Sequence, residues 1–157
     1  MAIRHQVIER RPDAVWAVLE DPELYADWVV GTSASWPLDT RWPQVDAALA
    51  YRVDLGPGTL EGRTVVRRVE PPRWLELEVD SGRLGTARIA IEVRPWGGQT
   101  LVLVDEHPHT APLDLLIQLR HRSMLPRLAR TVERVAVAAP GSSSSATEGD
   151  RTTSGRA

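Results

Sequence analysis

The chain has 157 residues, of which 42% are hydrophobic and 25% are charged, and its formal net charge is −2. These totals are typical of one globular domain, and the slightly acidic balance argues against nucleic acid or an anionic membrane surface as a partner. Cysteine is absent, which excludes disulfides and thiolate catalysis, and no segment resembles a signal peptide or reaches the ~20 apolar residues of a membrane span. We therefore expect a cytoplasmic protein without membrane insertion.

The first quarter of the chain predicts a strand and two short helices. Residues Ile3 to Glu9 alternate weakly and predict a strand, and a helix opens at Pro12, a residue suited to the first helical position. Asp21-Pro22 interrupts that helix, because proline disfavours helical geometry in the residue before it. A second short helix is expected from Glu23 to Asp27, and a strand from about Gly31 to Pro37.

The middle of the chain has the period of two that is typical of strands. Turn-forming pairs and triplets rich in glycine and proline separate the segments, and connections this short indicate an antiparallel arrangement of successive strands. The predicted strands are Ala47–Leu55, Thr59–Glu70, Trp74–Asp80, Gly85–Arg94 and Thr100–His107.

The last quarter predicts a long amphipathic helix and a tail. Apolar residues recur at helical spacing from about Leu113 to Val137, and Pro126 inside this segment predicts a kink or a break. Residues 140–157 contain Ser, Thr, Gly and charge with almost no large apolar residue, so we expect a disordered tail after a domain of residues 1–139.

Together these elements predict an α+β domain. Two short helices follow the first strand of a curved antiparallel sheet of about seven strands, and one long C-terminal helix crosses the concave face. Several strands are apolar at both parities, notably Ile89–Val93 and Thr100–Val104, so the pattern leaves open which of their faces points inward.

Tryptophan is the most informative residue type. Six of the eight aromatic residues are tryptophan, and Trp16, Trp28, Trp36 and Trp42 fall within the first 42 positions. Large half-polar side chains beside a curved sheet either line a ligand cavity or fill a core, and both interpretations stay open at this point.

Several motifs, in this order, resemble the SRPBCC superfamily, in particular its START-like, polyketide cyclase/dehydrase-like branch with the birch-pollen-allergen fold. The motifs extend over roughly residues 3–136 and are Val15-Trp16-Ala17-Val18-Leu19, Asp21-Pro22, Tyr25, Asp27-Trp28-Val29-Val30-Gly31, Asp39 with Trp42-Pro43, Val69-Glu70-Pro71-Pro72-Arg73, Thr100 with Val102 and Glu106, Arg122, and Arg127-Leu128.

The resemblance implies a helix-grip fold in which the sheet and the long helix enclose an apolar pocket. It further implies binding of a hydrophobic or amphipathic small molecule such as a lipid, polyketide or quinone, for storage, transport or sensing, with no cofactor. We expect a monomer or weak homodimer. The predicted ligand-binding residues are Trp16, Trp28, Asp39, Trp42, Tyr51, Leu77, Ile91, Val102, Val104, Glu106 and His121.

Glu106 is the main candidate for chemistry. If Val102 and Val104 point into the grip, the period of two sends Glu106 the same way, and a carboxyl group in an apolar cavity has a raised pKa. An alternative function is therefore a polyketide cyclase or dehydratase, with Glu106 as general base and Tyr51 or His121 as donor. A solvent-facing strand end or an ion pair with arginine would equally explain Glu106.

The other polar candidates each have an ordinary structural explanation. Asp39 is expected either to bind a polar ligand end or to cap loop N–H groups, and His121 is expected either to face the cavity or to lie at its boundary. His107-Pro108-His109 lacks further ligands at a recognisable spacing, so no metal site is predicted. A third class of function, a protein-interaction module, would need an exposed apolar patch that sequence does not reveal.

Overall fold

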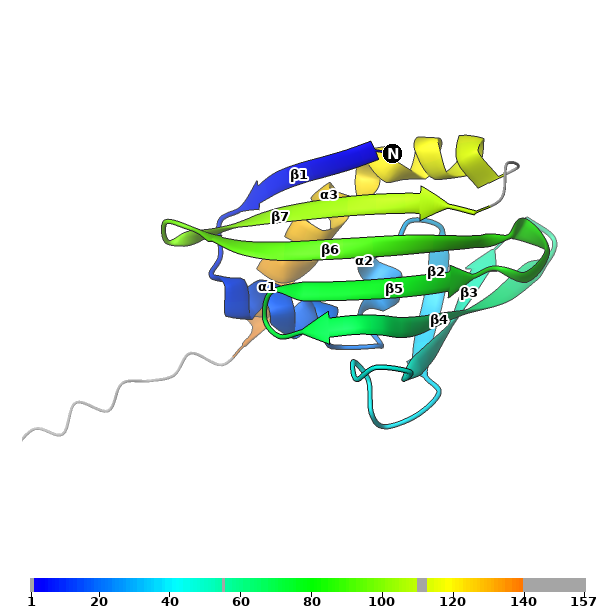
Figure 1. Ribbon diagram of the computed structural model, residues 1–157, viewed down its shortest axis with the longest axis horizontal. Coiled ribbons are helices and arrows are strands. Elements are labelled where there is room, and N and C mark those ends of the chain that lie inside the picture. Colours follow the sequence, from blue (N-terminus) through cyan, green and yellow to red (C-terminus); the bar gives the residue numbers. More distant parts are fainter. Residues whose placement is uncertain (1, 55, 110–112, 140–157) are drawn as a thin grey trace, which may run out of the picture.

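The computed structural model describes residues 2–54, 56–109 and 113–139, and in the final helix its description of side chains begins at Met124. Figure 1 shows one sheet with helices on a single side of it. The predicted tail, residues 140–157, lies outside the described residues.

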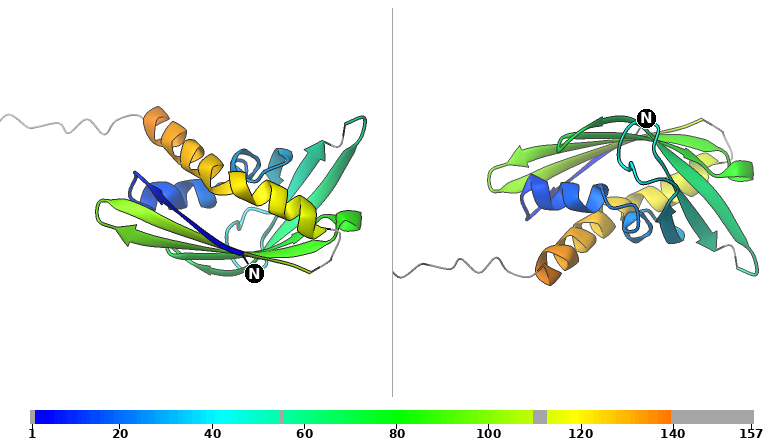
Figure 2. Two further views of the ribbon diagram at one scale, coloured as in Figure 1. Left: turned by 90° about the horizontal axis from the view of Figure 1, so that it is seen from above. Right: turned by 90° about the horizontal axis from the view of Figure 1, so that it is seen from below.

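Seven strands form one antiparallel sheet in the spatial order β1-β7-β6-β5-β4-β3-β2. The first strand therefore pairs with the last, and each of the others pairs with its neighbours in the chain, as the short turns predict. Figure 2 shows that this sheet bends around the helices. The strands are β1 (Ala2–Ile8), β2 (Thr32–Pro37), β3 (Ala48–Asp54), β4 (Thr59–Glu70), β5 (Trp74–Asp80), β6 (Thr86–Trp96) and β7 (Gln99–Pro108).

Two short helices follow β1. Helix α1 (Pro12–Leu19) has proline at its start and Asp13 in its first turn, where a negative charge is favourable. Helix α2 (Tyr25–Trp28) begins two residues later than expected from the sequence. A turn of 3₁₀ helix, η1 (Gly82–Leu84), joins β5 to β6.

Helix α3 (Leu113–Ala138) is continuous through Pro126, so the break that Pro126 suggests does not occur. Pro126 is exposed, and the carbonyl that loses its intrahelical hydrogen bond there can be solvated. Figure 2 shows the helix crossing the concave side of the sheet, beside α1 and α2. Its described buried residues are Met124, Leu125, Leu128, Thr131 and Val132.

The structure resolves which parity of each strand faces the helices. In β7 the alternating residues Thr100, Val102, Val104 and Glu106 are all buried. Their cross-strand partners continue the same face: Val93 lies opposite Val102, Ile91 opposite Val104 and Ile89 opposite Glu106. The remaining buried side chains that build the concave face are Leu49, Tyr51, Val53, Thr64, Val66, Leu75, Leu77 and Ala87.

The outer face of the sheet carries arginine–glutamate pairs, although not all in the arrangement expected from the sequence. The sequence places Arg63, Arg67 and Arg68 in one long strand, which predicts cross-strand pairs with Glu76, Glu78 and Glu92. Arg67 does bind Glu78, at 3.2 Å, but Arg68 binds Glu70 within its own strand at 2.8 Å. The other two expected partners are taken by arginines of β6, with Arg88 on Glu76 and Arg94 on Glu92. A register irregularity between Val66 and Arg68 interrupts the alternation that the expectation assumed.

Candidate functional site

Glu106 lies on the concave face with only 6% of its surface exposed. It sits opposite Ile89 of β6 and Ala2 of β1, on a strand whose inward residues are otherwise apolar except for Thr100. Burial raises the pKa of Glu106 to about 8; the positive charge of Arg4 lowers it and the negative charge of Asp105 raises it further. At neutral pH the carboxyl group is therefore mostly protonated and can donate a hydrogen bond.

Tyr25 and Thr64 add hydroxyl groups to the same interior. Tyr25 comes from α2 and its hydroxyl accepts a hydrogen bond of 2.9 Å from the Thr64 hydroxyl of β4. Burial is the largest cause that raises the pKa of Tyr25 above its usual range, and Glu106 contributes to the same shift. Tyr51 is a larger charge-related cause of this shift than Glu106, and Tyr25 thus stays neutral.

Tyr51 reaches across the concave face from β3. Its hydroxyl donates to the carbonyl of Asp80 at 3.3 Å and is hydrogen-bonded to the Ser81 hydroxyl. Its ring centroid lies 5.8 Å from that of Tyr25. The ring passes over Gly62, its register partner on β4, where a Cβ atom would lie 2.3 Å from the ring. Glycine at position 62 is therefore what allows the tyrosine to lie flat over β4.

Three of the six tryptophans belong to the buried core. Trp16, Trp28 and Trp42 are 6%, 1% and 9% exposed, and Trp28 packs edge-on against Tyr25 at 5.3 Å. The indole Nε1 atoms of Trp28 and Trp42 are buried and have no hydrogen-bond partner within the described part of the chain. Leu77, Ile91, Val102 and Val104 complete the predicted apolar wall, each at most 4% exposed.

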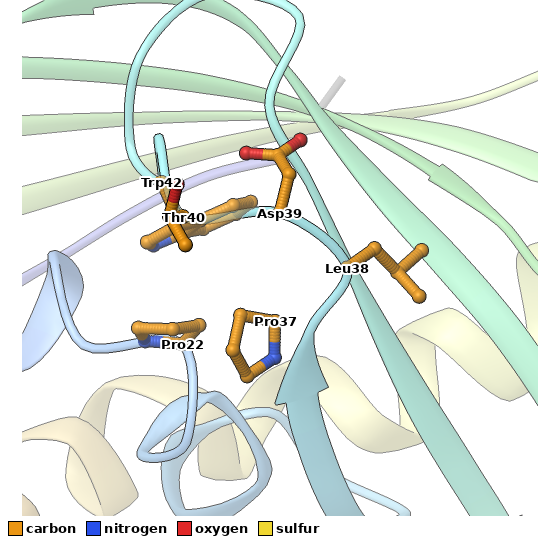
Figure 3. A pocket seen from close by; sticks show the side chains of 6 residues that line it. All are labelled: Pro22, Pro37, Leu38, Asp39, Thr40 and Trp42. Atoms are coloured by element: carbon orange, nitrogen blue, oxygen red, sulfur yellow. The ribbon is translucent and has the colours of Figure 1, made fainter.

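A pocket of about 440 Å³ opens where the α1–α2 connection approaches the loop between β2 and β3. Figure 3 shows Pro22 and Pro37 facing Trp42 and Asp39 across it, with Leu38 and Thr40 beside them. Its lining is apolar except for Asp39 and Thr40. Glu106, Tyr51 and Tyr25 do not line it, so this pocket is separate from the polar groups of the concave face.

Asp39 has a structural role in that loop. Its carboxylate accepts hydrogen bonds from the backbone N–H of Arg41 at 2.8 Å and of Ala48 at 3.3 Å. The bond from Arg41 is the largest cause that lowers the pKa of Asp39. This is the capping arrangement that we weighed against ligand binding, and it occupies both carboxylate oxygens while Asp39 still borders the pocket.

Comparison with known proteins bears on the fold. No protein-family model matches the sequence, and no curated protein matches it. Among solved structures, protein NE0264 from Nitrosomonas europaea has a TM-score of 0.68 at 14% identity, with 85% of this chain and 94% of that chain covered. Ara h 8.0201 has a TM-score of 0.70 at 8% identity, with coverages of 87% and 96%. The Zhui aromatase/cyclase from Streptomyces sp. R1128 has a TM-score of 0.68 at 16% identity, with 89% of this chain and 97% of that chain covered. The chain therefore shares the helix-grip α+β fold of these structures.

The histidine candidates are less informative within this fold. His107 lies on β7 and its Nε2 atom is 3.0 Å from Asp105, on the face away from the helices. No group of three or more metal-ligating side chains occurs among the described residues. His121 lies on α3 in the stretch whose side chains are outside the described set, so its predicted role in binding or proton transfer stays a prediction.

Sequence reasoning missed three residues of the concave face: Arg4, Tyr25 and Thr64. Tyr25 was predicted only as part of a motif, and no role was predicted for Thr64. Arg4 was detectable in principle, because counting back by two from Ile8 gives Gln6 and then Arg4 on the inward face.

None of the described helices is long and apolar enough to cross a membrane.

Proposed function

We propose that this protein binds a hydrophobic or amphipathic small molecule, such as a lipid, polyketide or quinone, between the concave face of the sheet and α3. The observation that carries the proposal is the composition of that face: an apolar wall in which a few polar groups, Glu106, Tyr25, Tyr51 and Thr64, are embedded. Sites for small molecules typically combine mostly apolar lining with a small number of placed polar groups.

Two further observations support this function. The buried Nε1 atom of Trp28, whose ring packs against Tyr25, carries no hydrogen bond among the described residues, which is costly in a closed core and less so where a ligand or water is bound. One solved protein of the same fold is named an aromatase/cyclase, and another is named a di-domain ARO/CYC from the steffimycin biosynthetic pathway.

Native mass spectrometry of the protein purified from its own host tests the proposal directly. We expect a co-purifying small molecule that is released on denaturation, and a rise in melting temperature with members of a lipid, polyketide and quinone panel. Absence of both a bound mass and any thermal shift across the panel would rule the function out.

A second candidate function is catalysis by the same site, because the raised pKa of Glu106 makes its ionised form, although the minor one at pH 7, a stronger base than an ordinary carboxylate. In a cyclase or dehydratase, Glu106 removes an acidic α-proton of a poly-β-keto substrate, and a hydroxyl such as that of Tyr51 stabilises the resulting enolate oxygen. The variant Glu106→Gln separates the two functions: turnover collapses while binding persists if Glu106 is the base. Glu92→Gln, on the outer face of β6, is the matched control and should change neither.

A further inference from the structure

Arg4 is an inward-facing cation on the edge strand of the sheet. In β1 the inward residues are Ile8, which is 3% exposed, and the half-buried Gln6 and Arg4, whereas Ile3 and Val7 are 61% and 40% exposed on the opposite face. The register places Arg4 opposite Val104 of β7, one step along that strand from Glu106. Arg4 thus borders the concave apolar wall rather than the solvent-facing surface.

The guanidinium group of Arg4 has no counter-ion within the described residues. Its Nε atom is buried and without a hydrogen-bond partner. Arginines of the outer face behave differently, since Arg67 and Arg94 form ion pairs with Glu78 and Glu92 at 3.2 and 2.7 Å. A partly buried cation without a paired anion is unfavourable, so an anionic group brought beside Arg4 would be stabilised there.

Glu106 does not supply that anion. Arg4 is close enough to lower its pKa, yet burial dominates and keeps the carboxyl group mostly neutral at pH 7. No ion pair joins the two side chains among those found in the described chain, and Asp105 is directed to His107 on the other face. The hydroxyls of Tyr25 and Thr64 are neutral. Within the described part of the chain, this leaves the positive charge of Arg4 beside an apolar wall and a neutral carboxylic acid.

We propose that Arg4 binds the acidic head group of an amphipathic ligand, whose apolar body lies along Val102, Val104 and Ile91. A carboxylate suits this position because guanidinium and carboxylate groups form paired, charge-assisted hydrogen bonds. Glu106, as a neutral donor, adds a further hydrogen bond to the same head group. This inference rests on the proposed function and names the ligand class that the site selects.

The test compares two probes that differ only in the head group. Dodecanoate and dodecan-1-ol are titrated at pH 7 into the wild-type protein, and binding is followed by tryptophan fluorescence and calorimetry. A hydrogen bond to a charged group corresponds to roughly a tenfold or greater difference in affinity, so we expect dodecanoate to bind at least about tenfold tighter. Arg4→Met should abolish this preference and leave dodecan-1-ol within about twofold of its wild-type affinity, and Arg4→Lys should retain most of the preference.

Arg63→Met is the matched control. Arg63 is exposed on β4, lies on the face away from the helices and forms no ion pair among the described residues, so its loss should leave both affinities unchanged. If both probes bind but Arg4→Met keeps the wild-type preference, the role of Arg4 is overturned and the binding function stands. If neither probe binds the wild-type protein, the role of Arg4 is overturned, and the lipid, polyketide and quinone panel decides the binding function separately.

A measurement on the wild-type protein alone covers the case in which Arg4→Met does not fold. The carboxyl carbon of [1-¹³C]dodecanoate is titrated by NMR while bound, and contact with Arg4 predicts a pKa for the bound carboxyl below that of the free acid. A bound carboxyl whose pKa is unchanged or raised would overturn the assignment.

Discussion

The close approach of the Tyr51 ring to Gly62 predicts that adding a Cβ atom at position 62 lowers the free energy of unfolding. Replacing Gly62 by alanine places a Cβ atom 2.3 Å from both Cζ and Oη of Tyr51, and 2.7 Å from Cε2. Carbon atoms in favourable contact lie about 3.5–4.0 Å apart, so the ring must retreat by more than ~1 Å. The retreat pulls the hydroxyl away from Asp80 and Ser81, to which it is hydrogen-bonded.

The expected loss of stability has two parts. Overpacking of this kind costs about 1–3 kcal/mol, and a lost hydrogen bond costs about 1 kcal/mol more. Without the clash, alanine would stabilise a strand by about 0.5–1 kcal/mol relative to glycine. We therefore expect Gly62→Ala to lower the free energy of unfolding by about 2–3 kcal/mol, measured by urea denaturation.

A double-mutant cycle tests the cause. In the Tyr51→Leu background the side chain no longer reaches Gly62, so Gly62→Ala should cost nothing or stabilise, giving a coupling energy of about 2 kcal/mol or more. Gly58→Ala is the control, because a Cβ atom at position 58 meets nothing within 4 Å. Equal costs of Gly62→Ala in the wild-type and Tyr51→Leu backgrounds would refute the reasoning.

Three further predictions concern Glu106, the pocket and the tail. Between the ordinary pKa of 4.5 and the folded pKa of about 8, the folded state holds a proton that the unfolded chain has released, so stability falls as pH rises through this interval, by at most ~1.4 kcal/mol per pH unit. Glu106→Gln should remove that slope in urea unfolding at pH 5, 6.5 and 8, and an unchanged slope would exclude Glu106 as its source. Leu38→Asp, in the wall of the 440 Å³ pocket, should weaken binding of dodecan-1-ol several-fold if ligands pass or rest there, whereas Val45→Asp, in the same loop and equally exposed, should not. Ending the chain after Ala139 should leave melting temperature and ligand affinity unchanged; a clear drop in either would place residues 140–157 within the folded unit.

The architecture was predictable because local chemistry specifies it. Thr59–Glu70 and Trp74–Asp80 have the bounds expected from their alternation and from the turns beside them. The start of α2 was predicted two residues early, since a four-residue helix has too little periodicity to locate its ends. The sequence predicted a kink or a break at Pro126, and the break does not occur, because packing of Met124, Leu125 and Leu128 against the rest of the core holds the helix together on both sides of an exposed proline.

The polar groups of the site were only partly predictable, because most depend on register. The inward direction of the Glu106 side chain follows from the period of two, once it is known which face of β7 points toward the helices. The relation of Tyr51 to Gly62 and Ser81 depends on how β3, β4 and β5 align, and no local pattern encodes that alignment. Arg4 was not predicted, because the alternation of β1 is weak in the sequence and a charged inward residue is uncommon.

The electrostatics of the concave face favour binding over base catalysis as the primary role. A general base has to be ionised, and a carboxyl group with a pKa of about 8 is ionised in roughly a tenth of the molecules at pH 7. The abundant form is the acid, which donates a hydrogen bond beside the cation Arg4. An incoming carboxylate or enolate is stabilised by both groups at once, because the acid donates to it and the guanidinium offsets its charge. Its negative charge would also raise the pKa of Glu106 further, so a ligand of this class strengthens the donor that holds it and disfavours the base.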